Sequence, residues 1–214
     1  MLVAASSKQG KSYLVRDILL NHYSLIDKPL ESIIWLYHKN SRDDELFETL
    51  KKELNVPIEF MEGFPAEEIS QEKLFKGDGL KCLVLDDVVT TALKSPVFVD
   101  LFTVISHHSN VCIIAILQNI FCETSGQRQI MNNIIRNLTY LVLFPDRRQM
   151  AACKQIARTY FNGEEYKLVR PFKELIDTGQ KHTYMLIDLE NANIRFNCLR
   201  PTDEAFAYVF AKED

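Results

Sequence analysis

Short β-rich runs alternate with longer segments of helical spacing along most of the chain. The runs lie at 2–5, 32–37, 57–60, 81–87, 110–117 and 139–144, and the helical segments at 11–22, 41–54, 96–108, 127–137 and 147–160. Most of the runs are apolar without interruption, which is typical of strands buried on both faces of a sheet. The run at 57–60 is expected to be an accessory strand. The alternation predicts an α/β fold with a mostly parallel sheet sandwiched by helices.

The pattern changes after residue 162. A helix is expected at 164–176, followed by strands at 183–189 and 194–199 that are joined by the tight polar turn "ENAN". Two strands so connected predict a C-terminal β-hairpin on the sheet edge. We therefore expect a core at 1–162, with 163–214 completing the same domain. The polar stretch 63–80 contains Gly63 and Pro65 near its start and Gly77 and Gly79 near its end. These residues predict a mobile loop.

Composition narrows the class of protein. The chain has 47% apolar residues among 214, no apolar run of eighteen residues and no basic-then-apolar start, so we expect an intracellular protein without a membrane span. Its five cysteines lack CxxC spacing, and Cys82 and Cys112 lie in strand-like runs, which suggests reduced core thiols. The net charge of −4 argues against a broad nucleic-acid surface. A local basic strip remains, formed by Arg147, Arg148, Lys154, Arg158, Lys167, Arg170 and Lys173.

The first strand leads into a candidate phosphate-binding loop. Gly10, Lys11 and Ser12 open the helix that follows, as this type of loop requires, whereas Ala5 stands where the first glycine is usual. In this interpretation Lys11 reaches the outer phosphates and the Ser12 hydroxyl binds Mg²⁺. The alternative is a Ser/Lys-rich turn that caps an amphipathic helix. The expected nucleotide-binding residues are Ala5, Ser6, Ser7, Lys8, Gln9, Gly10, Lys11, Ser12 and Tyr13.

Two acidic residues follow the fourth apolar run. Asp86 and Asp87 would lie at the carboxyl end of a buried strand, where a phosphate-binding loop also lies. We expect Asp86 to support the metal ion together with Ser12, and Asp87 to deprotonate the attacking water. An acidic pair is also common where a strand simply enters a loop.

Gln118 follows the next apolar run, "IIAIL". An amide at this position could contact both the water and the γ-phosphate, and so couple hydrolysis to motion of the following segment. The alternative is an ordinary polar strand exit. With the two preceding motifs, Gln118 is the candidate γ-phosphate sensor.

The motifs "GKS", "LVLDD", "LFTVISHHSNVCIIAILQNIF", "YLVLF" and "YMLIDL" occur in this order over nearly the whole chain. In these motifs the chain resembles the genome-packaging ATPases of Polinton-like and adintovirus-type elements, which are relatives of the poxvirus packaging ATPase in the FtsK–HerA superfamily of P-loop NTPases. The resemblance implies a RecA/FtsK–HerA-like fold, the cofactors ATP and Mg²⁺, and a homo-oligomeric ring motor that pushes double-stranded DNA into a capsid. It also implies contacts with capsid proteins, residence in the nucleus or cytoplasm of an infected cell, and association with the virion.

A ring motor of this kind completes each active site with an arginine from a neighbouring subunit, which stabilises charge in the transition state. Arg136 ranks first because it lies between the Gln118 motif and "TYLVLF", and Arg148 ranks second. Arg128 is a weaker candidate. Surface arginines in helical i,i+4 pairs are the alternative interpretation for at least two of the three.

One rival function belongs to another class of protein, and a second is a different type of enzyme. A nucleotide-binding assembly or scaffold protein with little turnover would fit Ala5 and the lack of an obvious DNA-binding module. A small-molecule phosphotransferase would need an arginine-rich lid, and no such motif is evident. Hydrolysis of ATP with and without duplex DNA separates these functions.

Overall fold

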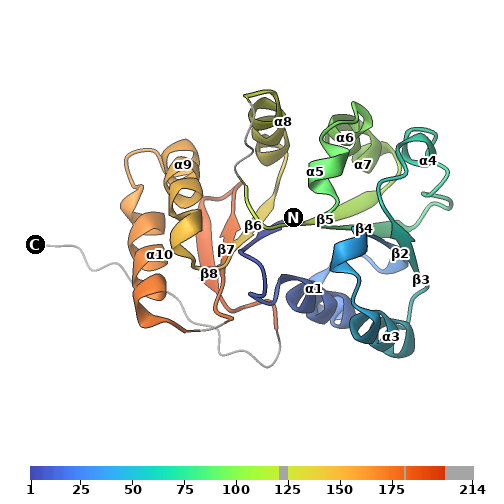
Figure 1. The fold of residues 1–214 in the computed structure, drawn as a ribbon, viewed down its shortest axis with the longest axis horizontal. Coiled ribbons are helices and arrows are strands. Elements are labelled where there is room, and N and C mark those ends of the chain that lie inside the picture. Colours follow the sequence, from blue (N-terminus) through green and yellow to red (C-terminus); the bar gives the residue numbers. More distant parts are fainter. Residues whose placement is uncertain (121–124, 181, 201–214) are drawn as a thin grey trace, which may run out of the picture.

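The computed structural model describes residues 1–120, 125–180 and 182–200. It has one sheet of eight strands, in the order β3-β2-β4-β5-β1-β6-β7-β8 (Figure 1). The strands are β1 (Leu2–Ala4), β2 (Leu30–Tyr37), β3 (Ile58–Glu62), β4 (Leu80–Asp86), β5 (Val111–Leu117), β6 (Tyr140–Leu143), β7 (Met185–Asp188) and β8 (Asn193–Phe196). The strands from β3 to β6 in this order are parallel, and β7 and β8 add an antiparallel hairpin at one edge. The predicted α/β class with its C-terminal hairpin is confirmed.

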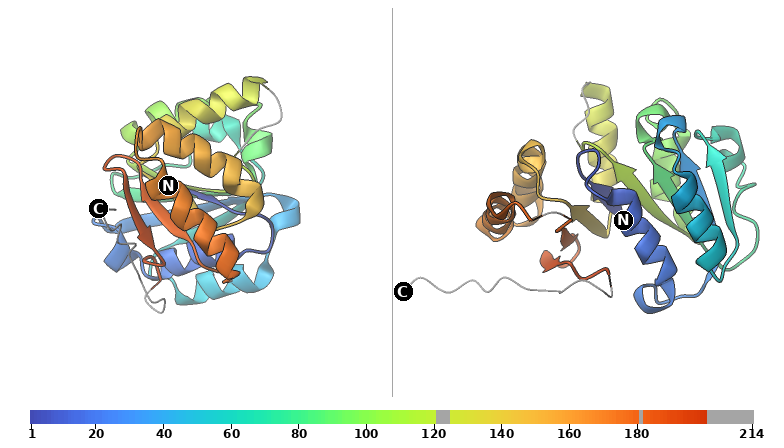
Figure 2. Two further views of the ribbon diagram at one scale, coloured as in Figure 1. Left: turned by 90° about the vertical axis from the view of Figure 1, so that its left-hand side faces the viewer. Right: turned by 60° about the horizontal axis from the view of Figure 1, so that its bottom comes forward.

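Helices cover both faces of this sheet. They are α1 (Lys11–Leu20), α2 (His22–Leu25), α3 (Asp44–Glu53), α4 (Ala66–Ser70), α5 (Val89–Ala92), α6 (Val97–Asp100), α7 (Ser106–His108), α8 (Ser125–Arg136), α9 (Met150–Tyr160) and α10 (Tyr166–Thr178). In Figure 1, α1 and α3 lie below the sheet and α4 to α8 above it. Figure 2 shows α9 and α10 side by side at the end of the sheet formed by β6, β7 and β8. No helix in the described part of the chain is long and apolar enough to cross a membrane.

The central strands are apolar on both faces because two separate cores need them. Trp35 and Val84 pack with α1 and α3, whereas their chain neighbours Leu36 and Leu85 pack with the helices on the other face. Successive side chains of a strand point to opposite faces, so a strand covered on both sides needs apolar residues at successive positions. The uninterrupted apolar runs follow directly from this sandwich.

One expected element is confirmed and two others differ in detail. The accessory run at 57–60 is β3, which pairs in parallel with β2 at the sheet edge. The stretch 63–80 is not all loop, because it holds α4, whose Ile69 is buried in the core. The helix expected at 96–108 is formed by α6, a π-helical segment at Leu101–Ile105, and α7.

The expected core thiols are Cys82, which is buried, and Cys112, which is half-buried, and both are free thiols. Cys122 lies outside the described residues.

Candidate nucleotide-binding site

The site lies where the carboxyl ends of β4, β5 and β1 meet. These three strands are neighbours, and their register places Asp86 opposite Ile116, and Ala4 opposite Leu117. Parallel strands end at the same edge of a sheet, so the segments that follow them converge there. The loop after β1, the acidic pair at the end of β4 and Gln118 after β5 are thereby brought together.

The loop between β1 and α1 has the backbone shape of an anion cradle. Lys8 and Gly10 both have left-handed backbone, with φ values of 63° and 89°, and Gly10 is the N-cap residue of α1. The first N–H groups of a helix have no partner within the helix and carry partial positive charge, so an anion is favoured in front of them. The Gly10 position also leaves little room, since a Cβ there would lie 3.1 Å from Nδ1 of His182.

Ala5 replaces the usual first glycine without backbone strain. Its φ is not among the positive values of the chain, and its amide donates a hydrogen bond of 3.1 Å to the carbonyl of Leu117. Ala5 therefore continues the pairing of β1 with β5, and its side chain is fully buried. Because glycine is needed only where φ is positive or space is lacking, an alanine is suited to this position.

Lys11 begins α1 and turns back under the loop. Its side chain is only 7% exposed, and Nζ donates a hydrogen bond of 3.1 Å to the carbonyl of Ser6. Burial lowers the pKa of Lys11, while the carboxylates of Asp87 and Asp86 act in the opposite direction. A lysine held in this way is a positive charge close to the loop and to both acidic residues.

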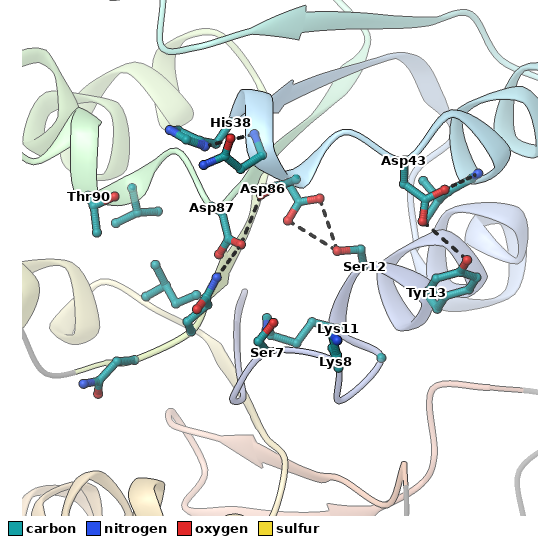
Figure 3. Close-up of a pocket in the computed structure, with 18 of the residues that line it drawn as sticks. Ser7, Lys8, Lys11, Ser12, Tyr13, His38, Asp43, Asp86, Asp87 and Thr90 are labelled. Carbon is teal, nitrogen blue, oxygen red and sulfur yellow. Dashed lines mark hydrogen bonds between the residues drawn. The ribbon is translucent and has the colours of Figure 1, made fainter.

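The side chains of Ser12 and Asp86 are in hydrogen-bonding contact (Figure 3). The Ser12 hydroxyl contacts both carboxylate oxygens of Asp86, at 3.3 and 3.2 Å. Asp86 is 2% exposed, and burial together with the Asp87 charge raises its pKa to about 7. Hydroxyl and carboxylate oxygens are ligands that suit Mg²⁺, which usually takes one or two carboxylates and completes its shell with phosphate oxygens and water. The two residues fit the predicted metal site.

Asp87 is held by two donors from neighbouring loops. Its Oδ2 accepts hydrogen bonds from Ser41 Oγ at 3.1 Å and from Gln118 Nε2 at 2.9 Å. Among the described residues no donor contacts Oδ1. The backbone of Asp87 is left-handed, with a φ of 55°, which turns the side chain away from the direction of β4. The carboxylate is thus oriented through one oxygen, and its other oxygen can accept a proton.

These groups surround a cleft of about 860 Å³. Among its lining residues are nine that the sequence had indicated: Ser7, Lys8, Gly10, Lys11, Ser12, Tyr13, Asp86, Asp87 and Gln118. Ala5 and Ser6 are buried beneath the loop. Gln9 contacts His182 through its carbonyl, at 3.3 Å from Nδ1. The cleft is large enough for a nucleotide.

The segment after β2 supplies lining residues that the sequence motifs did not indicate. His38, Asn40, Ser41 and Asp43 line the cleft on the side of α3. Asp43 caps α3 by accepting a hydrogen bond of 3.0 Å from the Leu46 amide. Its other carboxylate oxygen is 3.4 Å from the Tyr13 hydroxyl. The signal was present in the sequence, since this polar segment follows an apolar strand at the same sheet edge as the motifs.

The two arginines expected to act between subunits do not line the cleft. Arg136 ends α8 and is exposed, in a small groove between α8 and α9 that also contains Arg128. Arg148 is 77% exposed and lies 3.3 Å from the carboxylate of Asp146, which follows β6 at the same sheet edge as the site. Both side chains are therefore available at the surface of the subunit.

Comparisons with known proteins identify a likeness to solved structures. No protein-family model matches the chain, and no curated protein matches its sequence. The solved structure of the genome packaging NTPase B204 from Sulfolobus turreted icosahedral virus 2, in complex with ATP-γS, matches with a TM-score of 0.55 and 14% sequence identity. The match covers 91% of this chain and 94% of that chain. This chain therefore shares the α/β fold of a viral genome-packaging NTPase.

Proposed function

We propose that this chain is an ATP-hydrolysing subunit of a DNA-packaging motor, which moves double-stranded viral DNA into a capsid. One observation carries the proposal: Lys11 and Ser12 in a loop of phosphate-binding shape, the Asp86–Asp87 pair and Gln118 meet in a single cleft. Each of these residue types has a separate task in ATP hydrolysis. The likeness to B204, a genome packaging NTPase solved with ATP-γS, supports the same function.

The residues divide the reaction among them. The amides of the loop and of the α1 N-terminus bind the phosphates, and Lys11 exchanges the Ser6 carbonyl for a phosphate oxygen. Ser12 and Asp86 would hold Mg²⁺, which would supply positive charge against the negative charge that develops on the phosphates. Asp87 takes a proton from the attacking water, and the Gln118 amide orients both that water and the Asp87 carboxylate.

Assembly into a ring would complete the site. An arginine from the neighbouring subunit stabilises the transition state, with Arg136 as the first candidate and Arg148 as the second. The sequence resemblance supports a relationship between this chain and the adintovirus- and poxvirus-related packaging ATPases of the FtsK–HerA superfamily. It also supports action in an infected cell, contacts with capsid proteins and association with the virion.

Exposed basic side chains are suited to the DNA phosphates. Lys154 and Arg158 on α9 and Lys173 on α10 are exposed, whereas Lys167 and Arg170 pair with Glu164 and Glu174. Exposed basic residues at this end of the molecule would give weak, salt-sensitive contacts that do not depend on DNA sequence. Such contacts suit a motor that must move along its substrate.

The proposal is tested by steady-state ATP hydrolysis of the purified chain, with and without duplex DNA. A packaging motor hydrolyses ATP with Mg²⁺ and is stimulated by duplex DNA at low salt. A scaffold protein binds ATP with little turnover in either condition. A phosphotransferase is indifferent to DNA and needs an acceptor molecule, and this result would also contradict the proposal.

A further inference from the structure

The turn that follows β6 reaches the site from the other side of β1. Strand β6 pairs with β1 so that Leu143 lies opposite Ala4, and a 3₁₀ turn at Arg147–Gln149 then leads into α9. Asp146, the N-cap residue of this turn, accepts a hydrogen bond from the Ser6 hydroxyl. The Ser6 carbonyl accepts a hydrogen bond from Lys11 Nζ. Ser6 therefore connects Asp146 with the phosphate-binding lysine.

Gln149, the last residue of the same turn, contacts the segment that follows β5. Its side chain is 1% exposed, and Nε2 donates a hydrogen bond of 2.9 Å to the main-chain carbonyl of Gln118. The Gln118 side chain in turn donates to Asp87. A turn of four residues therefore contacts the loop after β1 through its first residue, and the segment after β5 through its last.

Packing alone does not account for an amide at position 149. Its Oε1 is buried and has no hydrogen-bond partner among the described residues. A buried acceptor left unpaired costs free energy, and an apolar side chain of similar length would avoid that cost. What the amide adds over an apolar side chain is a fixed position for the Gln118 carbonyl.

Asp146 is suited to its part as an anion. Burial opposes its charge, but hydrogen bonds from the Ser6 hydroxyl and from the Arg148 amide and guanidinium hold the pKa of Asp146 below its usual value. The Arg148 amide lies 2.8 Å from Oδ1, while Oδ2 accepts from Ser6. A carboxylate that accepts hydrogen bonds from both segments links the 3₁₀ turn to the phosphate-binding loop.

We propose that Asp146 and Gln149 are positioning residues, Asp146 for the phosphate-binding loop through Ser6 and Gln149 for the Asp87–Gln118 pair through the Gln118 main chain. The inference rests on the proposed ATPase function. It assigns two different effects to neighbouring residues. Loss of the Asp146 contact weakens nucleotide binding, whereas loss of the Gln149 contact slows hydrolysis and leaves binding intact.

The Gln149 part is tested by a double-mutant cycle with Gln118. Gln149→Met should lower kcat by roughly tenfold or more and change KM by less than about twofold, because only the alignment of the reacting groups is lost. In a Gln118→Ala background, Gln149→Met should have no further effect on kcat. Gln155→Met, an exposed glutamine on α9, is the matched control and should retain wild-type turnover.

Thermal unfolding separates positioning from folding in this cycle. Gln149→Met, or Gln149→Leu if the first variant folds poorly, should have a midpoint equal to or above that of the wild type. An unchanged kcat in these variants would overturn the assignment. So would an equal loss of kcat with and without the Gln118 side chain, since a residue that acts through Gln118 cannot add to its removal.

The Asp146 part is tested by calorimetric binding of ATP-γS. Asp146→Ala should weaken binding by roughly tenfold, and Asp146→Asn, which can still accept from Ser6, should restore most of it. Equal affinity in Asp146→Ala and the wild type would overturn this part. If the wild type binds ATP-γS but does not hydrolyse ATP, the proposed function fails while the Asp146 result remains decisive. If the wild type hydrolyses ATP and the Gln149 cycle is additive, only the present inference fails.

Discussion

The Gln118 amide and the Asp87 carboxylate are joined by a hydrogen bond of 2.9 Å between Nε2 and Oδ2. This contact connects the segment after β5 with the end of β4, and it leaves the Asp87 Oδ1 without a donor among the described residues. The general base and the γ-phosphate sensor of the proposed mechanism thus form one unit. A displacement of Gln118 by the γ-phosphate would reorient the base at the same time.

Asp87→Asn should separate nucleotide binding from hydrolysis. The substitution keeps the side-chain size but removes the base, so ATP and Mg²⁺ should still bind while turnover falls by about 10²–10⁴-fold. Asparagine tolerates the left-handed backbone at this position, so the φ of 55° adds no strain to the variant. Asp86→Asn is the matched comparison, and ATP hydrolysis by this variant should instead depend less strongly on Mg²⁺. Two variants that are indistinguishable in calorimetry and turnover would contradict this division of roles.

Glycine substitution at position 5 should affect folding and not binding. Ala5→Gly removes a buried methyl group and adds backbone freedom to the unfolded chain, so we expect a loss of about 1–2 kcal/mol in the free energy of unfolding. Chemical denaturation measures this loss, and calorimetry should give wild-type ATP affinity. Gly10→Ala provides the contrast, because its φ of 89° and the nearby His182 make alanine unfavourable. A clear gain in affinity for Ala5→Gly would mean that the loop needs glycine there.

Asp86 should make the nucleotide-free protein less stable as the pH rises. Its pKa is about 7 in the folded state against an ordinary 3.8, so between these values the folded chain binds more protons than the unfolded one. The free energy of unfolding therefore falls from about pH 4 to pH 7, by an amount on the order of 4 kcal/mol at most. Asp86→Asn should flatten this fall. Urea titrations from pH 5 to pH 8, without Mg²⁺ or ATP, measure it, and equal slopes for both proteins would refute the prediction.

Hydrolysis should depend on contact between subunits. Arg136→Ala and Lys11→Ala subunits should each be inactive alone, and a mixture should regain activity where an intact arginine faces an intact loop. The arginine contribution should be roughly 10³-fold or more in rate. Arg195→Ala on the exposed face of β8 is the control and should remain active. The activity per subunit should also rise with protein concentration, and a flat dependence would rule out a trans-acting arginine.

Much of the fold was predictable because a strand that is packed on both faces has an apolar run in the sequence. For this reason β2 is apolar from Ile33 to Tyr37 and β4 from Cys82 to Leu85. Motifs placed after such strands must meet at one edge of the sheet. The strand order was not predictable, since nothing in the pattern says that β5 lies between β1 and β4. The π-helical segment at Leu101–Ile105 is likewise hidden in an ordinary helical pattern.

The candidate site was predictable where one residue type carries one task. Gly10, Lys11 and Ser12 follow one another as a phosphate-binding loop requires, and the two aspartates follow an apolar strand. Asp146 and Gln149 were not found, because their roles depend on which strand lies beside β1, and a glutamine in a helix start has no signature of its own. Residues that act through other residues become visible only when the contacts are known.

Steady-state phosphate release shows whether the cleft around Lys11 hydrolyses Mg²⁺-ATP. The wild type and Lys52→Ala, an exposed lysine on α3, should release phosphate at equal rates, with Mg²⁺ required. Lys11→Ala should fold normally and release none above background, because it lacks the charge that holds the outer phosphates. Equal release by the wild type and Lys11→Ala would mean that ATP is not hydrolysed in this cleft.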